Sequence, residues 1–137
     1  MKQSLPLWAA AVWWGSLSTL GFFVVPMLFA NLPTPAMAGN MAAKLFTAQT
    51  AVSTVAGLIL LLLLRSDKGF VHEAVAQSVT LFVMGGVLLA LLVEFGVSPH
   101  IVARDNLALW HGLGTGMYVV QWICAGVVFG KLAKRAQ

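Results

Sequence analysis

The stretch from Leu45 to Leu64, LFTAQTAVSTVAGLILLLLL, decides the fold of this chain. It holds no charged residue and ends in an unbroken run of leucines. A helix of about 20 apolar residues spans the hydrocarbon core of a bilayer. The stretch shows no alternation of apolar and polar residues, so it fits a membrane helix better than a strand of a membrane barrel. We therefore expect a transmembrane helix over residues 45–64.

The composition of the whole chain indicates the same environment. Of its 137 residues, 60% are hydrophobic and only 9% are charged, whereas about 25% of the residues of a soluble domain are charged. This length predicts one domain, surrounded by membrane lipids. The net charge of +4 does not indicate a nucleic-acid partner, because the basic residues lie mostly at the ends of apolar runs. The single cysteine, Cys124, argues against an intrachain disulfide and a cysteine zinc site.

Three further apolar runs are long enough to cross a bilayer, over residues 7–29, 76–97 and 107–130. The segment from Asn31 to Pro35 contains two prolines, which cannot continue a helix, and short polar segments follow the second and third runs. Together with 45–64, these runs predict an all-α fold: an integral membrane, antiparallel four-helix bundle forming one domain over residues 1–137. The runs show no convincing internal repeat.

The basic residues predict how the bundle is oriented. Six of the eight lie on the side that holds both termini and the middle loop, whereas Lys44 and Arg104 lie on the other side. Since cytoplasmic loops carry the excess of Lys and Arg, both termini are expected in the cytoplasm of a bacterial cell, with the chain in the inner membrane. The six residues are Lys2, Arg65, Lys68, Lys131, Lys134 and Arg135.

Helices in lipid pack through small residues that let their backbones approach closely. Small residues recur four positions apart in the last three runs and so share one face of each helix. In the first run, Pro26 removes a hydrogen-bond donor and predicts a kink near the outer end. The residues expected to pack the helices together are Gly57, Gly86, Ala90, Gly112 and Gly116.

Three polar residues on three different runs fall at one depth. Counting from the outer ends at about 1.5 Å per residue, Gln49, Glu94 and His111 lie roughly 5 to 8 Å below the boundary. An ionised carboxylate in lipid costs several kcal/mol, so Glu94 is expected to be protonated, open to water, or paired with Arg104, His111 or Gln49. Two interpretations stay open for this polar layer: a clasp that holds the helices together, or a functional site such as a proton relay.

The histidines give little support to a metal site. His100 and His111 are the candidates on the outer side, but their separation is not that of a helical ligand pair. We expect no metal and no cofactor, with haem or copper as the alternative. The sequence also contains no nucleophile elbow, phosphate loop or catalytic carboxylate pair, which favours a protein that is not an enzyme.

Four motifs together resemble a known family. They are Trp13-Trp14-Gly15, the stretch Gly21–Phe29, the stretch Ala38–Phe46, and Trp110-His-Gly-Leu-Gly114. In this order they resemble the bacterial branch of the transmembrane protein 205-like family, a domain of unknown function. The resemblance covers nearly the whole chain and implies four spans, but it brings no catalytic residues. The family is also distantly similar to four-helix membrane proteins linked to copper handling and porphyrin oxidation, for whose membrane histidines His111 offers one match.

Three functions follow from these patterns. The first is a non-enzymatic, multi-pass inner-membrane protein that has an outward-facing polar pocket and associates with itself or with a partner membrane protein. The second is a small transporter or channel for a cation, a proton or an amphipathic solute, in which Glu94 and His111 control access. The third is a haem- or copper-binding membrane protein.

Overall fold

The computed structural model describes residues 4–66 and 73–135, and within these ranges it contains helices and no strand. Among the described residues, four helices are long and apolar enough to cross a membrane: Leu5–Asn31, Pro35–Arg65, Ala76–Val102 and Leu107–Ala133. The prediction of an all-helical fold with four such helices is confirmed. Lys2 and Lys68, which entered the count of basic residues, lie outside the described residues.

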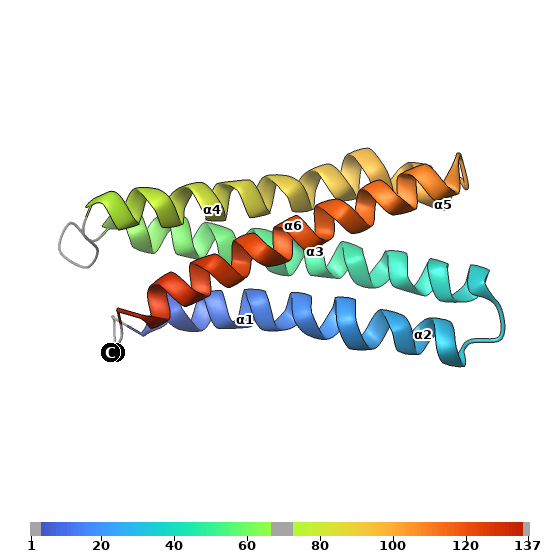
Figure 1. Cartoon of the computed structure of the whole chain (residues 1–137), viewed down its shortest axis with the longest axis horizontal. Helices are drawn as coiled ribbons and strands as arrows, with labels where there is room; N and C mark the ends of the chain where they lie inside the picture. The colour runs from blue at the N-terminus through green and yellow to red at the C-terminus, as the bar shows by residue number, and fades with distance from the viewer. Residues whose placement is uncertain (1–3, 67–72, 136–137) are drawn as a thin grey trace.

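The first and third of these helices are each composed of three segments. The first contains α1 (Leu5–Thr19), the π-helical turn η1 (Leu20–Val24) and α2 (Val25–Asn31). The second is α3 (Pro35–Ser66). The third lies within α4 (Glu73–Leu92), the π-helical turn η2 (Val93–Val97) and α5 (Ser98–Val102), and the fourth is α6 (Leu107–Ala133). In Figure 1, the α2–α3 and α5–α6 connections lie at one end of the long axis, and the start of α1 and the end of α6 lie at the other.

The helix α3 begins at Pro35, well before the span predicted from Leu45. Proline is favoured in the first turn of a helix, because its missing N–H needs no partner there. The Thr34 hydroxyl accepts a hydrogen bond from the Met37 N–H at 3.2 Å and so caps the helix. The prolines of this segment therefore end one helix and start the next, and the added turns of α3 extend beyond the predicted span.

Each π-helical turn ends two residues before a proline. The Val25 N–H bonds the Leu20 carbonyl, five residues earlier, and the Ser98 N–H bonds the Val93 carbonyl in the same way. Pro26 and Pro99 come next in the chain, and neither has a backbone N–H that needs a hydrogen-bond acceptor. The predicted kink at Pro26 thus corresponds to a π turn, in which one extra residue is inserted into the helix.

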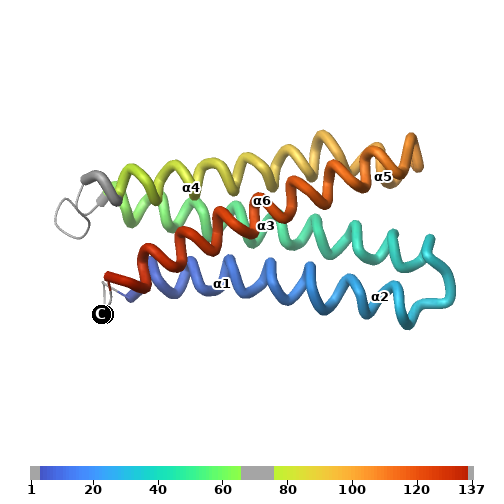
Figure 2. Tube along the Cα trace, in the orientation of Figure 1, coloured from blue at the N-terminus to red at the C-terminus, as the bar shows by residue number. Residues whose placement is uncertain are grey.

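The two halves of the chain have the same order of helical segments, which can be followed along the trace in Figure 2. In each half a long helix, a π turn, a short helix and a second long helix follow one another. The segments 20–26, LGFFVVP, and 93–99, VEFGVSP, share Phe, Val and Pro at matching positions. The helix α1 packs against α6 as α4 packs against α3. The repeat is therefore visible in the structure, although the apolar runs alone did not show it.

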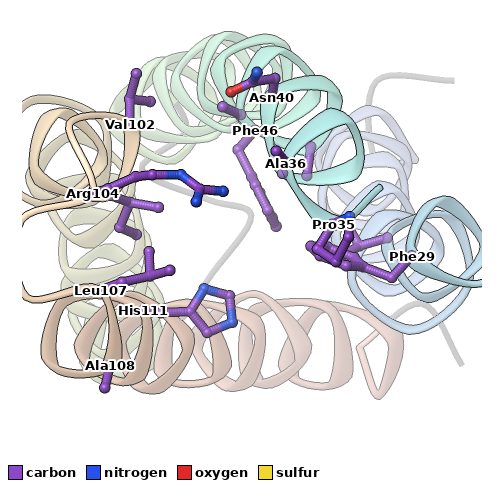
Figure 3. A pocket seen from close by; sticks show the side chains of 15 residues that line it. Phe29, Pro35, Ala36, Asn40, Phe46, Val102, Arg104, Leu107, Ala108 and His111 are labelled. Atoms are coloured by element: carbon purple, nitrogen blue, oxygen red, sulfur yellow. The ribbon is translucent and has the colours of Figure 1, made fainter. Parts of the chain in front are cut away.

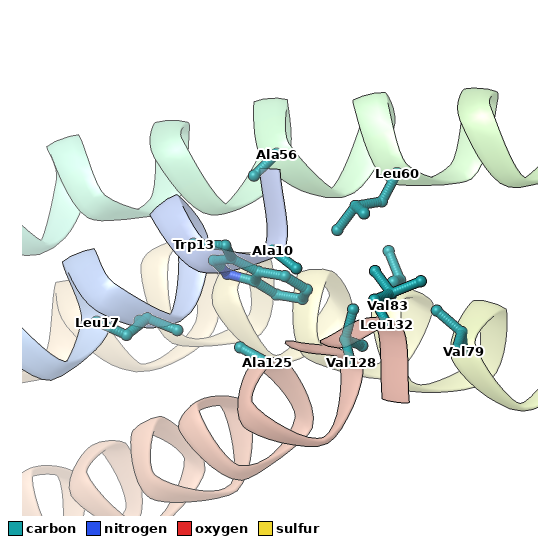
Figure 4. Close-up of a cluster of buried hydrophobic side chains, with 10 residues drawn as sticks. All are labelled: Ala10, Trp13, Leu17, Ala56, Leu60, Val79, Val83, Ala125, Val128 and Leu132. Carbon is teal, nitrogen blue, oxygen red and sulfur yellow. The ribbon is translucent and has the colours of Figure 1, made fainter. Parts of the chain in front are cut away.

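The buried apolar cluster (Figure 4) includes Ala10 of α1 and Leu132 in the last turn of α6. It therefore lies toward the end of the molecule that holds the start of α1 and the end of α6. Its largest member is Trp13, whose side chain is 0% exposed. Close packing around it depends on Gly86, because a Cβ there would lie 2.7 Å from the Trp13 ring. Gly57 similarly leaves room for Val87. Ala90, the third small residue of this set, is also buried.

Large apolar side chains cover much of the outer surface. Phe95 is 75% exposed and Leu81 is 70% exposed, and many others among the described residues are similarly open. A soluble monomer rarely exposes a contiguous apolar patch of more than a few hundred Å². This surface fits contact with lipid tails.

Candidate functional site

A cavity of about 630 Å³ lies where the two halves meet, at the end with the α2–α3 and α5–α6 connections. This is the size of a typical small-molecule site, about 300–1,000 Å³. Most of its wall is apolar and comes from α2, α3, α5 and α6. The early start of α3 supplies part of this wall. The polar residues that line the cavity are Asn40, Arg104 and His111.

Arg104 reaches the cavity from the turn between α5 and α6. Its φ is 59° and that of Asn106 is 37°, both in the left-handed region that residues other than glycine adopt rarely. The Arg104 N–H bonds the Ile101 carbonyl at 3.1 Å, which ties the turn back onto α5. Figure 3 shows the guanidinium directed into the space that the helices enclose. The strained turn thus positions a fixed positive charge at the cavity.

The neighbouring Asp105 is held by a different partner. The His100 Nδ1 lies 3.3 Å from the Asp105 Oδ2, and the His100 ring stacks on Trp110 with 4.0 Å between ring centroids. Asp105 therefore pairs with His100 rather than with Arg104. Among the described residues that line the cavity, none is an aspartate or a glutamate.

His111 lies on α6, and its ring is directed into the same space as the Arg104 guanidinium (Figure 3). Phe46 of α3 points inward from the opposite side. The Phe46 ring contacts Tyr118 edge-on at 5.3 Å, and the Tyr118 hydroxyl donates to the Leu17 carbonyl at 2.7 Å. A chain of contacts thus fixes the aromatic wall opposite the two basic side chains.

The other members of the predicted polar layer lie elsewhere. The Gln49 amide donates to the hydroxyls of Ser16 at 3.0 Å and Ser53 at 3.4 Å. The Gln121 amide donates to the same Ser53 hydroxyl at 2.9 Å. Gln49, Ser53 and Gln121 are all buried, so they form an interior network that joins α1, α3 and α6 instead of lining the cavity.

Glu94 also has a partner that the sequence did not suggest. The Thr47 hydroxyl donates to the Glu94 Oε1 at 2.8 Å, linking α3 to η2. In the described part of the chain, this bond takes the place of the expected contact with Arg104, His111 or Gln49. The structure therefore brings Arg104 and His111 together at one cavity and separates Gln49 and Glu94 from them.

The remaining candidates are placed as follows. Gly112 and Gly116 of α6 have no neighbouring atom within 4 Å of a built Cβ, so they border open space. His100 is engaged with Asp105, as described above. Within residues 4–66 and 73–135, no three His, Cys, Asp or Glu side chains gather as a metal site would require. The haem or copper alternative stays a prediction. The absorbance spectrum and the metal content of the purified protein test it.

A protein family described as a domain of unknown function (DUF4149) matches residues 8–109. The chain belongs to this family. The DUF4149 match runs from α1 into the start of α6, and so it includes Arg104 and ends just before His111. No curated protein and no solved structure matches the chain. Family membership therefore agrees with a membrane protein of unknown activity and assigns no reaction to the cavity.

Proposed function

We propose that this protein is a non-enzymatic, multi-pass protein of the bacterial inner membrane that binds an amphipathic molecule in the cavity. Its four helices form an antiparallel bundle, both termini face the cytoplasm, and the cavity opens at the outer side. This orientation rests on the excess of basic residues at the other end. The proposal also includes membership of the transmembrane protein 205-like family, which the sequence motifs resemble.

The observation that carries the proposal is the composition of the cavity wall. Apolar side chains such as Phe29 and Phe46 form most of it, and Asn40, Arg104 and His111 supply the polar groups. A site of this kind binds a ligand through its apolar body and orients it through a few polar contacts. No nucleophile with an adjacent base lines the cavity in the described residues, so binding rather than a covalent step is its proposed role.

Filling the cavity is expected to abolish this binding. Gly39 lines the cavity, and nothing lies within 4 Å of a Cβ built there. The substitution Gly39→Leu would place a branched apolar side chain in the space that the ligand occupies. We expect a fluorescent fatty acid to bind this variant at least about tenfold more weakly than wild type, as measured by emission from protein held in phosphatidylcholine nanodiscs.

Gly15→Leu is the matched control for this measurement. Gly15 also has open space around a built Cβ, but it lies on α1 and does not line the cavity. Its variant should bind the probe as wild type does. Equal binding by the Gly39→Leu protein would contradict the proposed function.

Self-association is part of the same proposal. Gly112 and Gly116 lie four residues apart on α6 and border open space. Paired small residues at this spacing let two membrane helices approach closely. A second copy of this chain, or a partner membrane protein, is proposed to pack there.

A transporter for an amphipathic solute is the second candidate. The observation that favours it is the position of the cavity between two similar halves of the chain, since transporters often hold their substrates at the interface between structural repeats. Flux of the fluorescent fatty acid through proteoliposomes distinguishes this candidate from simple binding. The cation and proton versions rely on Glu94 and His111 acting together, and the Thr47 bond of Glu94 gives them no support.

A further inference from the structure

We infer that the occupant of the cavity is an anionic phospholipid of the surrounding bilayer, whose headgroup phosphate is held by Arg104 and His111. This inference rests on the proposed function and names the ligand class of the same cavity. Its argument uses the charges at the cavity, the character of its wall and the source of the ligand.

The charge at the cavity is positive and not neutralised by the acidic residues of that end. Asp105 pairs with His100, and Glu94 accepts a hydrogen bond from Thr47. Arg104 makes no ion pair in the described part of the chain, and its guanidinium points into the cavity (Figure 3). Arginine binds phosphate through two parallel hydrogen bonds. A ring nitrogen of His111 can add a further donor from α6.

Beyond its polar residues, the wall of the cavity is an apolar surface. Phe46 is directed inward, and the small residues Ala36, Gly39 and Ala43 of α3 leave the space open. A free phosphate ion would touch Arg104 and His111 and leave this apolar space empty. An acyl chain attached to the phosphate would fill it. The complementary ligand is therefore an anionic headgroup joined to an apolar tail.

The position of the cavity favours the bilayer as the source. The turn that holds Arg104 joins two membrane-capable helices, so Arg104 lies where lipid headgroups are found. A basic pocket between membrane helices can bind the anionic headgroup of a lipid. The halves of the chain also differ here: among the described residues that line the cavity, the first half contributes Asn40 and apolar residues, whereas the second half contributes Arg104 and His111. Both basic groups of the lining thus come from the second half.

Native mass spectrometry of the full chain tests this inference. The protein is released from a bilayer of equal parts phosphatidylglycerol and phosphatidylcholine with the same acyl chains. Wild type should retain the anionic lipid in preference, and Arg104→Gln should reduce this preference by about tenfold, since a hydrogen bond to a charged group contributes enough for that factor. His111→Gln should reduce it less. Lys44→Gln should leave it unchanged, because Lys44 carries a charge outside the cavity wall.

The other outcomes separate the two proposals. Equal retention of both lipids, lost in Gly39→Leu, would overturn the anionic ligand and leave the amphiphile-binding function standing. Retention that Gly39→Leu does not change would refute both. A loss of preference in Lys44→Gln as large as in Arg104→Gln would overturn the inference, because a general surface charge would then explain it. Displacement of phosphatidylglycerol by inorganic phosphate at a matched concentration would also overturn it, because the apolar tail would then contribute nothing.

Discussion

Replacing Trp13 by alanine is expected to lower the free energy of unfolding by about 3–5 kcal/mol, the range for removing a large buried aromatic side chain. The Trp13 ring lies in the buried cluster among side chains of α3, α4 and α6 (Figure 4). A Cβ built at Gly86 of α4 would lie 2.7 Å from this ring. Its removal would leave a cavity that the surrounding helices close only in part, so their packing contacts would be lost. Unfolding in a detergent titration followed by circular dichroism measures the change.

Trp8→Ala provides the control on the same helix. The Trp8 side chain is 68% exposed and is not part of the cluster, so its substitution should change the free energy of unfolding by less than about 1 kcal/mol. Similar losses for the two variants would show that Trp13 does not have the central packing role that the structure gives it.

The second large effect is expected from Gly86→Leu. A Cβ at this position would lie 2.7 Å and 2.9 Å from two atoms of the Trp13 ring and 3.4 Å from the Cys124 Cβ. The helices α1 and α4 would have to separate, which costs about 1–3 kcal/mol or more for an overpacked core. The better helix propensity of leucine offsets at most about 1 kcal/mol of this cost. The melting temperature in detergent should fall accordingly.

The adjacent glycine gives a close control. Nothing lies within 4 Å of a Cβ built at Gly85, so Gly85→Leu should leave the melting temperature unchanged or raise it slightly. In the double variant Trp13→Ala, Gly86→Leu, the missing ring makes room for the leucine, and the combined loss should be smaller than the sum of the single losses. Strict additivity would argue against direct contact between the two positions.

The membrane helices could be predicted from the sequence because their signal depends on length and polarity alone. A run such as Leu45–Leu64 has to lie in a bilayer whatever its neighbours are. The start of α3 at Pro35 could not be predicted from length and polarity. The sequence pattern assigns Pro35 to a loop, whereas in the structure Pro35 lies in a first helical turn, where its missing N–H costs no hydrogen bond.

The polar layer shows what a depth calculation omits. Counting residues along each helix places Gln49, Glu94 and His111 at one level, but it does not give the rotation of each helix about its axis. Gln49 faces the interior network, whereas His111 faces the cavity. The π turn at Glu94 inserts one residue and so rotates the side chains around it relative to a regular α-helix. The contact between Glu94 and Thr47 could therefore not be predicted from the spacing of residues in the sequence.

One feature of the sequence could have predicted the position of the cavity. The match between LGFFVVP at residues 20–26 and VEFGVSP at 93–99 marks two equivalent helix ends, and a site between two such ends is a common arrangement in membrane proteins. The left-handed turn that directs Arg104 inward has no comparable signal, because neither Arg104 nor Asn106 is a glycine.

The central claim is that an outward-facing cavity holds an amphipathic ligand, and the labelling of a cysteine placed in its wall tests it most directly. Ala36 lines the cavity, and Cys124 is the single natural cysteine, so Ala36→Cys is built on a Cys124→Ser background. A membrane-impermeant maleimide should label this variant from outside intact spheroplasts, and a bound fatty acid should slow the reaction. Lys134→Cys, at the opposite end, should react only after permeabilisation. Labelling of Ala36→Cys that also requires permeabilisation, or that proceeds at the same rate with the fatty acid present, would contradict the account.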